Sequence, residues 1–440
     1  MRPLNICMVS DFFYPGMGGV ESHLYNNSQC LMQRGHKVVI ITHAYGNRRG
    51  VRYLAGGLKV YYIPALIVYS NASLPTFFCT FPIFRQIFIR EQISIVHGHQ
   101  AFSTFCHEAI LHARSMGLKT VFTDHSLLGF GDTSGILLNK LLKFTLSDVH
   151  HAICVSHTSK ENTVLRAALD PGQVSVIPNA IIAEQFVPDP GARDPKWTTV
   201  VVLSRLVYRK GIDLLVAAVP RICARCPRVR FIIGGDGPKR INLEQMREQH
   251  MLQDRVELLG SVKASDVRNV LVRGDIFLNT SLTEAFCIAI VEAAACGLLV
   301  VSTKVGGIPE VLPRSMVTFA APEEDEVVEA LRLAVEQAKE RERGAEARFH
   351  GLVKKMYSWH NVAERTERVY LKVVDAEEPP LIERFRRYYG CGLVAGKLFC
   401  LVAAVDFLIG VVLAWLWPRD QIEIARGFSK ERYQEEIRNL

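Results

Sequence analysis

Two pairs of charged residues in the second half of the chain have the types and spacing of a site for sugar and phosphate. Glu284 and Glu292 are separated by seven residues, so a helix that begins near Phe286 would place them about two turns apart on similar faces. One carboxylate could accept hydrogen bonds from sugar hydroxyls, and the other could accept both hydroxyls of a ribose. Arg205 and Lys210 lie five residues apart, and two cations there could hold a diphosphate that leaves as a sugar bond breaks.

Each pair also has a plainer interpretation. Two glutamates on an exposed helix are common, and an isolated Arg and Lys are typical of a solvated basic loop. The context favours a site, because the glutamates precede AAACGLLVVST, a helix running into a strand, and then a glycine-rich loop at Val305–Glu310.

A glycine-rich segment and three histidines are the candidate ligand-binding residues of the first half. Gly16–Glu21 reads GMGGVE, which lets the backbone approach a ligand and offers free helix N–H groups to an anion, although a plain tight turn fits equally well. His97 and His99 end one apolar run and His125 follows the next. Three histidines also suit a metal, but no carboxylate completes an obvious set and no D-x-D motif occurs. We therefore expect no metal.

Strands and helices in alternation must position these residues. Continuous apolar runs predict strands buried on both faces of a parallel sheet. The predicted strands are Asn5–Val9, Lys37–Thr42, Ile93–His97, Lys119–Thr123 and Ala152–Val155 in a first series, and Thr198–Leu203, Val229–Gly234, Val256–Leu259, Ile276–Asn279 and Leu299–Ser302 in a second. The fold is predicted to be α/β with two doubly wound, Rossmann-like domains facing a cleft, and ligands at the carboxyl ends of the strands.

The domain boundaries follow from composition. The Pro- and Gly-rich segment near residue 190 predicts a first domain over 1–190. A second domain with closing helices is expected over 191–375, a linker over 376–392, a transmembrane helix over 393–417 and a short tail over 418–440. Gly234–Pro238 (GGDGP), which includes Gly235, is expected to be a turn with a backbone role.

The segment Leu393–Trp417 is long enough to span a membrane. Its Leu, Ile, Val and Phe residues favour insertion by roughly 4–8 kcal/mol in total, whereas Asp406 opposes it by roughly 2.5–3.5 kcal/mol. We expect one span in which Asp406 faces another protein's helix; the alternative is an amphipathic hairpin on the membrane surface. Arg384, Arg386 and Arg387 precede the span, which fits a cytosolic N-terminal side, but basic residues also follow Trp417, so charge alone leaves both orientations open.

Four phenylalanines within Thr76–Glu91 share one face of a predicted helix: Phe77, Phe81, Phe84 and Phe88. That face suits the protein core and a membrane-docking helix equally well.

Composition limits the classes of partner and compartment. The net charge of +8 is scattered, which suits phosphate ligands or an anionic membrane and not nucleic acid. The eleven cysteines are odd in number and irregularly spaced, which indicates buried thiols in a reducing compartment. The N-terminus, MRPLNICMVSDF, lacks the apolar region of a signal peptide, so we expect the bulk of the chain to stay in the cytosol.

Taken together, the motifs resemble one family. GGVE, SRLVYRKG, GDGP and the E-x7-E pair occur in the order found in retaining, family-four glycosyltransferases of GT-B fold. The stretches VSDFFYPGMGGVESH, VHGHQAFS, TDHSLLGF and RKGIDLL resemble the catalytic subunits of phosphatidylinositol N-acetylglucosaminyltransferase complexes. This resemblance implies transfer of N-acetylglucosamine from UDP-GlcNAc to phosphatidylinositol with retention, the first step of GPI-anchor synthesis. It also implies a complex of several membrane subunits in the endoplasmic reticulum, a single span, cytosolic catalytic domains and no cofactor.

The resemblance further implies a role for each candidate residue. Arg205 and Lys210 would stabilise the departing diphosphate, Glu292 would hold the ribose and Glu284 would contact the donor sugar. The remaining residues expected at the substrate are His125 near the C6 hydroxyl, the backbone of Phe286, Cys287 and Ile288, the loop residues Gly18, Gly19 and Glu21, and His97, His99 and Gly235. The bulky, sulfur-bearing Phe286–Cys287 pair departs from many relatives.

The mechanism and the exact activity stay open at this point. No carboxylate is obviously placed as a nucleophile, so front-face attack assisted by the leaving phosphate is our working hypothesis. The alternatives are a related transferase that moves another hexose to a lipid, and a non-catalytic scaffold in a membrane complex, against which the intact charged residues argue. A nucleotide-binding oxidoreductase is disfavoured because no G-x-G-x-x-G follows the first strand.

Overall fold

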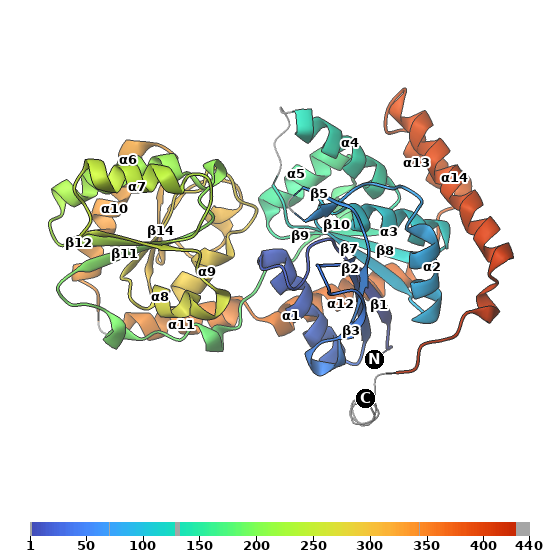
Figure 1. The fold of residues 1–440 in the computed structure, drawn as a ribbon, viewed down its shortest axis with the longest axis horizontal. Coiled ribbons are helices and arrows are strands. Elements are labelled where there is room, and N and C mark those ends of the chain that lie inside the picture. The colour runs from blue at the N-terminus through green and yellow to red at the C-terminus, as the bar shows by residue number, and fades with distance from the viewer. Residues whose placement is uncertain (1, 70, 128–132, 343, 428–440) are drawn as a thin grey trace. The chain divides into compact units, whose positions relative to one another are not determined.

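The computed structural model describes residues 2–69, 71–127, 133–342 and 344–427 (Figure 1). The chain forms two compact units. The N-terminal unit contains Met1–Val155, Ser159–Ile177 and His360–Leu440, and the C-terminal unit contains Ser156–Thr158 and Pro178–Trp359. The end of the TDHSLLGF motif and most of the predicted tail lie outside the described residues.

An eight-stranded sheet forms the centre of the N-terminal unit, in the order β10-β9-β8-β7-β1-β2-β4-β3. Its strands are β1 (Asn5–Val9), β2 (Lys37–His43), β3 (Gly50–Tyr53), β4 (Lys59–Ile63), β7 (Ile95–His99), β8 (Lys119–Asp124), β9 (His151–Cys154) and β10 (Val174–Val176). Neighbours pair in parallel except at the β3–β4 edge. A short hairpin, β5 (Ile67–Tyr69) and β6 (Ala72–Ser73), lies outside this sheet.

Helices cover both faces of this sheet. They are α1 (Gly19–Gln33), α2 (Phe81–Arg90), α3 (Thr104–Ser115), α4 (Thr133–Ser147), α5 (His157–Ala167) and α12 (Trp359–Asp375). Two further helices of this unit, α13 (Leu381–Tyr389) and α14 (Ala395–Leu416), pack on α4 and α3. Phe84 and Phe88 of α2 and Phe105 of α3 pack with strand residues such as Val9 and Val96 in one apolar cluster. The predicted strands are buried on both faces, as their unbroken apolar runs predict, whereas the edge strand β3 is exposed.

The C-terminal unit has a six-stranded parallel sheet in the order β13-β12-β11-β14-β15-β16. Its strands are β11 (Thr198–Leu203), β12 (Val229–Gly234), β13 (Val256–Gly260), β14 (Ile276–Asn279), β15 (Leu299–Thr303) and β16 (Val317–Ala320). Its helices are α6 (Ile212–Arg225), α7 (Arg240–Gln249), α8 (Val267–Leu271), α9 (Ile288–Ala295), α10 (Glu324–Lys339) and α11 (Ala345–Met356). The prediction of two doubly wound α/β domains is confirmed.

The boundary between the units differs from the predicted one near residue 190. The structure divides the chain after β10, at Ile177 and Pro178. The Pro-rich segment already belongs to the C-terminal unit, because Arg193 pairs with Glu346 at 2.8 Å. Helix α12 returns to the N-terminal unit, where the Tyr370 hydroxyl lies 2.6 Å from His97 Nδ1.

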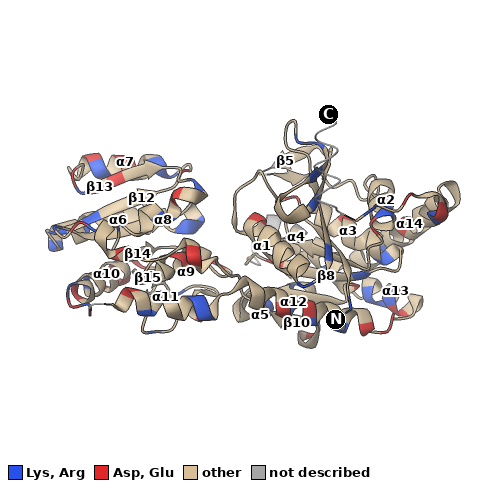
Figure 2. Ribbon diagram, turned by 90° about the horizontal axis from the view of Figure 1, so that it is seen from below, with Lys and Arg blue, Asp and Glu red and all other residues tan. Residues whose placement is uncertain are grey.

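The segment expected to be a linker, 376–392, contains α13 and packs on the N-terminal unit. Arg384 binds Asp148 at 2.8 Å and is therefore not a free cation beside a membrane. Elsewhere Lys and Arg are spread over the helices of both units together with Asp and Glu, with no single basic stripe among the residues drawn (Figure 2).

Helix α14 occupies the predicted span and is long and apolar enough to cross a membrane. The prediction for Asp406 is wrong, because its carboxylate is buried against α3 of the same chain. The phenylalanine face of α2 is core: Phe81, Phe84 and Phe88 are fully buried, and Phe77 lies before the helix begins. The three buried side chains therefore cannot dock on a membrane, whereas Phe77 is exposed.

Candidate active site

In both units the candidate residues follow the strands at which the sheet order reverses. In the C-terminal unit β11 lies between β12 and β14. The chain continues from β11 to β12 and β13 on one side, and from β14 to β15 and β16 on the other, so the strand order reverses between β11 and β14. Loops at such a point leave a crevice at the carboxyl edge of the sheet, where ligands of open α/β sheets bind. The loop after β11 carries Arg205 and Lys210, and the loop after β14 carries Glu284.

These two loops touch through their backbones. Gly211 has a φ of +64°, and a Cβ atom there would lie 1.8 Å from the carbonyl oxygen of Thr280. The Thr280 hydroxyl donates to the carbonyl oxygen of Lys210 at 2.9 Å. A residue larger than glycine at position 211 would therefore push apart the loops that hold the charged side chains.

The contact brings Lys210 and Glu284 together. The Lys210 ammonium donates to the Glu284 carboxylate, which also accepts from the Ser281 hydroxyl at 3.0 Å. Burial lowers the pKa of Lys210, but the charge of Glu284, the interaction with Cys287 and the hydrogen bond to Glu284 together outweigh burial, and the pKa is raised. Lys210 therefore stays cationic in the site. The Arg205 side chain is exposed and makes no side-chain hydrogen bond or ion pair with the residues described. Its positive charge lies close enough to Lys210 to lower the pKa of that ammonium slightly.

The N-terminus of α9 faces the same crevice edge. Cys287, the residue before the helix, has φ +70° and ψ 78°, and its side chain makes no cap for the helix N–H groups. A non-glycine residue in this region costs about 1–3 kcal/mol, and such strain is concentrated at functional sites. Burial raises the pKa of the Cys287 thiol to about 12, so the thiol is neutral and a poor nucleophile. Phe286 is buried edge-on against Tyr357, which fixes the backbone of the turn.

Glu292 lies one turn into α9, and its carboxylate has no hydrogen-bond or ion-pair partner in the part of the chain that is described. Burial raises its pKa to about 7. An unpaired, desolvated carboxylate is costly unless a ligand supplies donors. A ribose has two hydroxyls, and each can donate a hydrogen bond to one oxygen of the Glu292 carboxylate.

Two glycine-rich turns support the site without side chains. Gly235 has a φ of +139°, and a Cβ atom there would lie 1.8 Å from the carbonyl oxygen of Ser204. Gly307 donates its N–H to the Glu284 carbonyl oxygen at 3.0 Å. Gly235 thus has the expected backbone role, and each turn lets a neighbouring loop approach closely.

Glu310 is a residue of this unit for which the sequence predicted no role. Its carboxylate accepts from the backbone N–H groups of His157 at 2.6 Å and Thr158 at 2.9 Å, the first two residues of α5, which belong to the same C-terminal unit. An acidic residue bound to free N–H groups at a helix start stabilises that start. Its place in the glycine-rich loop Val305–Glu310 was the only signal in the sequence.

In the N-terminal unit the glycine-rich segment leads into α1. Gly18 is the residue before the helix and has no side chain to cap the free N–H groups. The buried carboxylate of Glu21 fills the space next to it, because a Cβ atom on Gly18 would lie 2.5 Å from Glu21 Oε2. A Cβ atom on Gly19 would meet nothing within 4 Å. Gly18 is therefore required for packing, whereas Gly19 leaves the helix start open to a ligand.

Three histidines gather beside this helix start. His99 ends β7, His125 follows β8, and His23 lies on α1; their ring nitrogens lie within 4.8 Å of one another and could hold a metal ion. His99 Nδ1 is 3.3 Å from His125 Nε2, and His99 Nε2 has no partner among the described atoms. Burial, with the neighbouring histidines, lowers the pKa of His99 and His125 well below the usual value, so both rings are neutral.

His97 is separate from this group in function. Its Nε2 lies 2.7 Å from the Thr123 hydroxyl and its Nδ1 is bonded to Tyr370, so both ring nitrogens are used within the core. His97 therefore supports the sheet and does not line a ligand site, unlike the expectation. His23 replaces it in the cluster. The stretch VSDFFYPGMGGVESH ends at His23, but no role was predicted for this residue, which reaches the sheet end from a helix.

Comparisons with known proteins agree with this architecture. The family described as "PIGA (GPI anchor biosynthesis)" matches residues 43–132, and "Glycosyl transferases group 1" matches residues 185–350. The gpi3 subunit of phosphatidylinositol N-acetylglucosaminyltransferase from Schizosaccharomyces pombe is 60% identical over 95% of this chain and 91% of its own. The corresponding subunit of the same enzyme from Homo sapiens is 56% identical over 96% of this chain and 88% of its own.

Solved structures share the fold at low sequence identity. A sucrose-phosphate synthase from Thermosynechococcus elongatus has a TM-score of 0.68 at 18% identity and covers 85% of this chain and 100% of its own. The HepE protein of Anabaena, solved with UDP-glucose, has a TM-score of 0.65 at 18% identity and covers 84% and 100%. These likenesses confirm the predicted GT-B fold.

Proposed function

The chain belongs to the PIGA family of phosphatidylinositol N-acetylglucosaminyltransferase subunits, and we propose that it transfers N-acetylglucosamine from UDP-GlcNAc to phosphatidylinositol. The sugar keeps its α configuration, and the product is the first intermediate of GPI-anchor synthesis. The observation that carries the proposal is the Lys210–Glu284 ion pair where the loops after β11 and β14 meet, together with the unpaired Glu292 one turn into the helix that follows. A nucleotide diphosphate sugar offers a matching set of groups.

Each charged residue has a role in donor binding. Glu292 accepts both ribose hydroxyls, and the free N–H groups at the start of α9 meet the diphosphate. Lys210 and the exposed Arg205 neutralise the charge that develops on the diphosphate as the sugar leaves. Glu284 orients Lys210 and accepts from a sugar hydroxyl.

The ion pair also bears on stereochemistry. A carboxylate bound to Lys210 and Ser281 is a weakened nucleophile, which supports attack by the acceptor from the face that the diphosphate vacates. The acceptor oxygen then forms a bond to C1, the bond from C1 to the diphosphate oxygen breaks, and the acceptor proton passes to a phosphate oxygen. In the N-terminal unit, His125 and the backbone of Gly19 are the groups proposed to bind a ligand. The proposal requires no metal.

The same proposal places the protein at a membrane. The acceptor is a lipid, and α14 is the apolar helix that holds the protein to the bilayer. We expect the endoplasmic reticulum, with both α/β units cytosolic, and further membrane proteins in one complex, since the relatives are named as subunits.

The test is transfer of radiolabelled sugar from UDP-GlcNAc to phosphatidylinositol in membranes that hold the full chain with its partner proteins. We expect labelled lipid from the wild type, none from Glu292→Ala, and normal amounts from Glu244→Ala, a surface glutamate of the same unit paired only with Arg240. Equal label from the two variants would contradict the site. No label with UDP-GlcNAc, but label with another nucleotide sugar, would identify a different hexosyltransferase. Failure with every donor would favour the scaffold role.

A further inference from the structure

The net positive charge of the chain comes from one segment of the sequence. Between Ser22 and Arg90 there are eight Lys and Arg residues and no Asp or Glu, whereas the rest of the chain has 44 residues of each sign. The charge is therefore concentrated in part of the N-terminal unit and not scattered as expected. A region without acidic residues attracts anions, because no neighbour along the chain neutralises its cations.

Three of these eight cations are exposed and lack carboxylate partners. Arg48 and Arg49 lie in the turn after β2, and Arg52 lies on the edge strand β3. None of the three forms an ion pair with any residue that the structure describes. The other five are paired or buried: Arg34 with Glu367, Lys37 and Lys59 with Glu91, Arg90 with Glu423, and Arg85 in the core.

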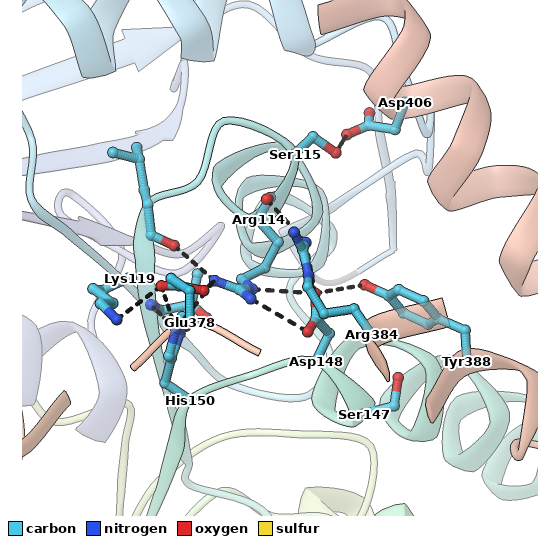
Figure 3. Close-up of polar contacts among 12 residues, drawn as sticks. Arg114, Ser115, Lys119, Ser147, Asp148, His150, Glu378, Arg384, Tyr388 and Asp406 are labelled. Atoms are coloured by element: carbon cyan, nitrogen blue, oxygen red, sulfur yellow. Dashed lines mark hydrogen bonds and ion pairs between the residues drawn. The ribbon is translucent and has the colours of Figure 1, made fainter. Parts of the chain in front are cut away.

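Arginines elsewhere in this unit are neutralised by carboxylates. Arg114 Nε lies 3.1 Å from Asp148 Oδ2, and Arg384 donates to the same carboxylate at 2.8 Å (Figure 3). Arg114 also binds Glu378 at 3.0 Å, so its charge is balanced within the protein. The arginines at β3 have no such compensation, and their donors are available to a ligand.

An open cavity of about 430 Å³ lies at these arginines. It is lined by Asn47, Arg48, Arg52, Tyr53, Leu54 and Tyr62. Gly50 pairs with Tyr62 across β3 and β4, and Arg52 is two residues further on, so Arg52 and Tyr62 share one face of the sheet. Gly50 has no side chain to cover the Tyr62 ring. The cavity is within the range of roughly 300–1,000 Å³ typical of small-molecule sites.

Tyr62 orients the Arg48 side chain. The guanidinium carbon lies 5.8 Å from the centroid of the Tyr62 ring, a cation–π contact. Hydrogen bonds of 3.2 and 2.9 Å between the backbones of Tyr45 and Arg48 fix the turn. Burial raises the pKa of the Tyr62 hydroxyl, whereas the interactions with Arg48 and the charge of Arg52 lower it, which places both guanidiniums near that oxygen. Two planar cations around one cavity match the oxygens of a phosphate ester.

The cavity lies at the edge of the sheet that carries the candidate ligand-binding residues. Strand β2 ends at His43 and β4 at Ile63, and these two residues pair, so the turn that contains Arg48 is at the carboxyl edge. The Tyr62 hydroxyl donates to the carbonyl oxygen of Tyr14 at 2.9 Å, just before the glycine-rich segment. A ligand held by Arg48 would therefore share this edge with the open start of α1.

The hairpin of β5 and β6 adds exposed apolar side chains at the same edge. Leu66, Val68 and Leu74 are all exposed. The Ser73 hydroxyl donates to Asp11 Oδ1 at 2.6 Å, and Asp11 follows β1, so the hairpin is held at the carboxyl edge. Cations and exposed apolar side chains together suit a phospholipid, which offers a phosphate and acyl chains. This combination favours a lipid headgroup over free phosphate.

We propose that Arg48 and Arg52 bind the phosphodiester of an inositol phospholipid headgroup in this cavity. They position the acceptor lipid on the N-terminal unit and take no part in bond making. The identity of the lipid rests on the proposed function, whereas the anion site does not. Charged residues on an edge strand also prevent pairing between molecules, and the experiments must separate this structural role from headgroup binding.

The first experiment measures headgroup binding without sugar transfer. Full-length protein, purified with its partner proteins in detergent, is titrated with water-soluble glycerophosphoinositol by calorimetry in the absence of UDP-GlcNAc. Arg48→Gln and Arg52→Gln should each raise Kd at least about tenfold, because each removes charge-assisted hydrogen bonds. Arg49→Gln is the matched control, since Arg49 is an exposed neighbour that does not line the cavity, and its Kd should stay within about twofold of the wild type.

The pattern among the variants decides the outcome. Arg48→Lys keeps the charge but not the planar fork, so its Kd should lie between those of the wild type and Arg48→Gln. Melting temperatures should not change, because both arginines are exposed. Equal Kd values for Arg48→Gln and Arg49→Gln would overturn the site, as a structural role at the strand edge predicts. Inorganic phosphate that bound as tightly as glycerophosphoinositol would show a site for free anions and overturn the headgroup.

The second experiment is steady-state transfer in membranes. Arg52→Gln should raise KM for phosphatidylinositol about tenfold and leave KM for UDP-GlcNAc unchanged, since the arginine contacts only the acceptor. A rise in the donor KM alone would overturn the assignment. If the wild type bound the headgroup but transferred no sugar, the proposed function would fail and the anion site would stand. If transfer occurred and headgroup binding did not depend on Arg48 or Arg52, the anion site alone would fail.

Discussion

Lys210 and Glu284 are ion-paired between the loops that leave β11 and β14, and each is only partly exposed. The Lys210 cation can stay bound to the leaving diphosphate. The Glu284 carboxylate can hold the sugar. Loss of either member removes a transition-state contact and leaves its partner poorly solvated.

Lys210→Met should therefore lower kcat by about 10²–10³-fold, with a smaller change in KM for the donor, since the charge on the diphosphate grows as the bond breaks. The measurement is steady-state transfer from UDP-GlcNAc in membranes. Lys239→Met is the control, because Lys239 pairs with Asp213 on the surface of the same unit and should retain full activity. A Lys210→Met enzyme with kcat within about threefold of the wild type would rule out this role.

Donor affinity should depend on pH through Glu292. Burial raises the pKa of Glu292 to about 7, so a fall in pH through 7 protonates it, and a protonated carboxyl cannot accept from both ribose hydroxyls. The Kd for UDP-GlcNAc should be about tenfold higher at pH 6 than at pH 8, as linkage predicts for binding to the ionised form. Calorimetry or ligand-induced stabilisation would measure it.

Glu292→Gln separates this titration from others, because the amide does not ionise and keeps the shape of the side chain. Its Kd should be higher than that of the wild type at pH 8 and flat between pH 6 and pH 8. A Glu292→Gln protein that retained the wild-type pH dependence would assign the titration to another group.

The backbone conformation at Cys287 predicts which side chains position 287 tolerates, independently of their charge. Its φ of +70° is readily adopted by glycine and disfavoured by a β-branched residue. Cys287→Gly should keep the melting temperature and most of the activity, whereas Cys287→Val should lose roughly 1–3 kcal/mol of unfolding free energy together with activity. If Cys287→Val were as stable and active as Cys287→Gly, the strained turn would have no part in the site.

The sequence predicts well those elements whose residue pattern lies within one short segment of the chain. β-Branched runs such as Lys37–Thr42 and Thr198–Leu203 form the strands. The helix predicted to begin near Phe286 begins at Ile288, so Glu292 lies on it, but Glu284 lies in the loop before it and the two glutamates do not share a helix face. The short strands β10 and β16 lack such a pattern and were not predicted.

Contacts between distant parts of the chain were not predictable. Asp406 finds His112 across 294 residues, and no local pattern tells whether a buried carboxylate is satisfied within the chain or by another protein. Helix α12 is amphipathic, but its pattern does not say which sheet it covers; Glu367 bound to Arg34 and His36 places it on the N-terminal unit. His23 was missed for the same reason.

The histidine cluster gives the last prediction, which concerns metal. We expect His99 and His125 to act as neutral rings that, with His23 beside them, bind no metal, so EDTA treatment should leave transfer activity unchanged and purified protein should contain no stoichiometric transition metal. The low pKa values of His99 and His125 fit this role, but neutral rings are also what a metal needs, so elemental analysis must decide. The control is His157→Ala, a histidine at the start of α5 outside the cluster. Stoichiometric zinc that is present in His157→Ala, absent from His23→Ala and removed together with activity by EDTA would show the cluster to be a metal site and would contradict the metal-free mechanism.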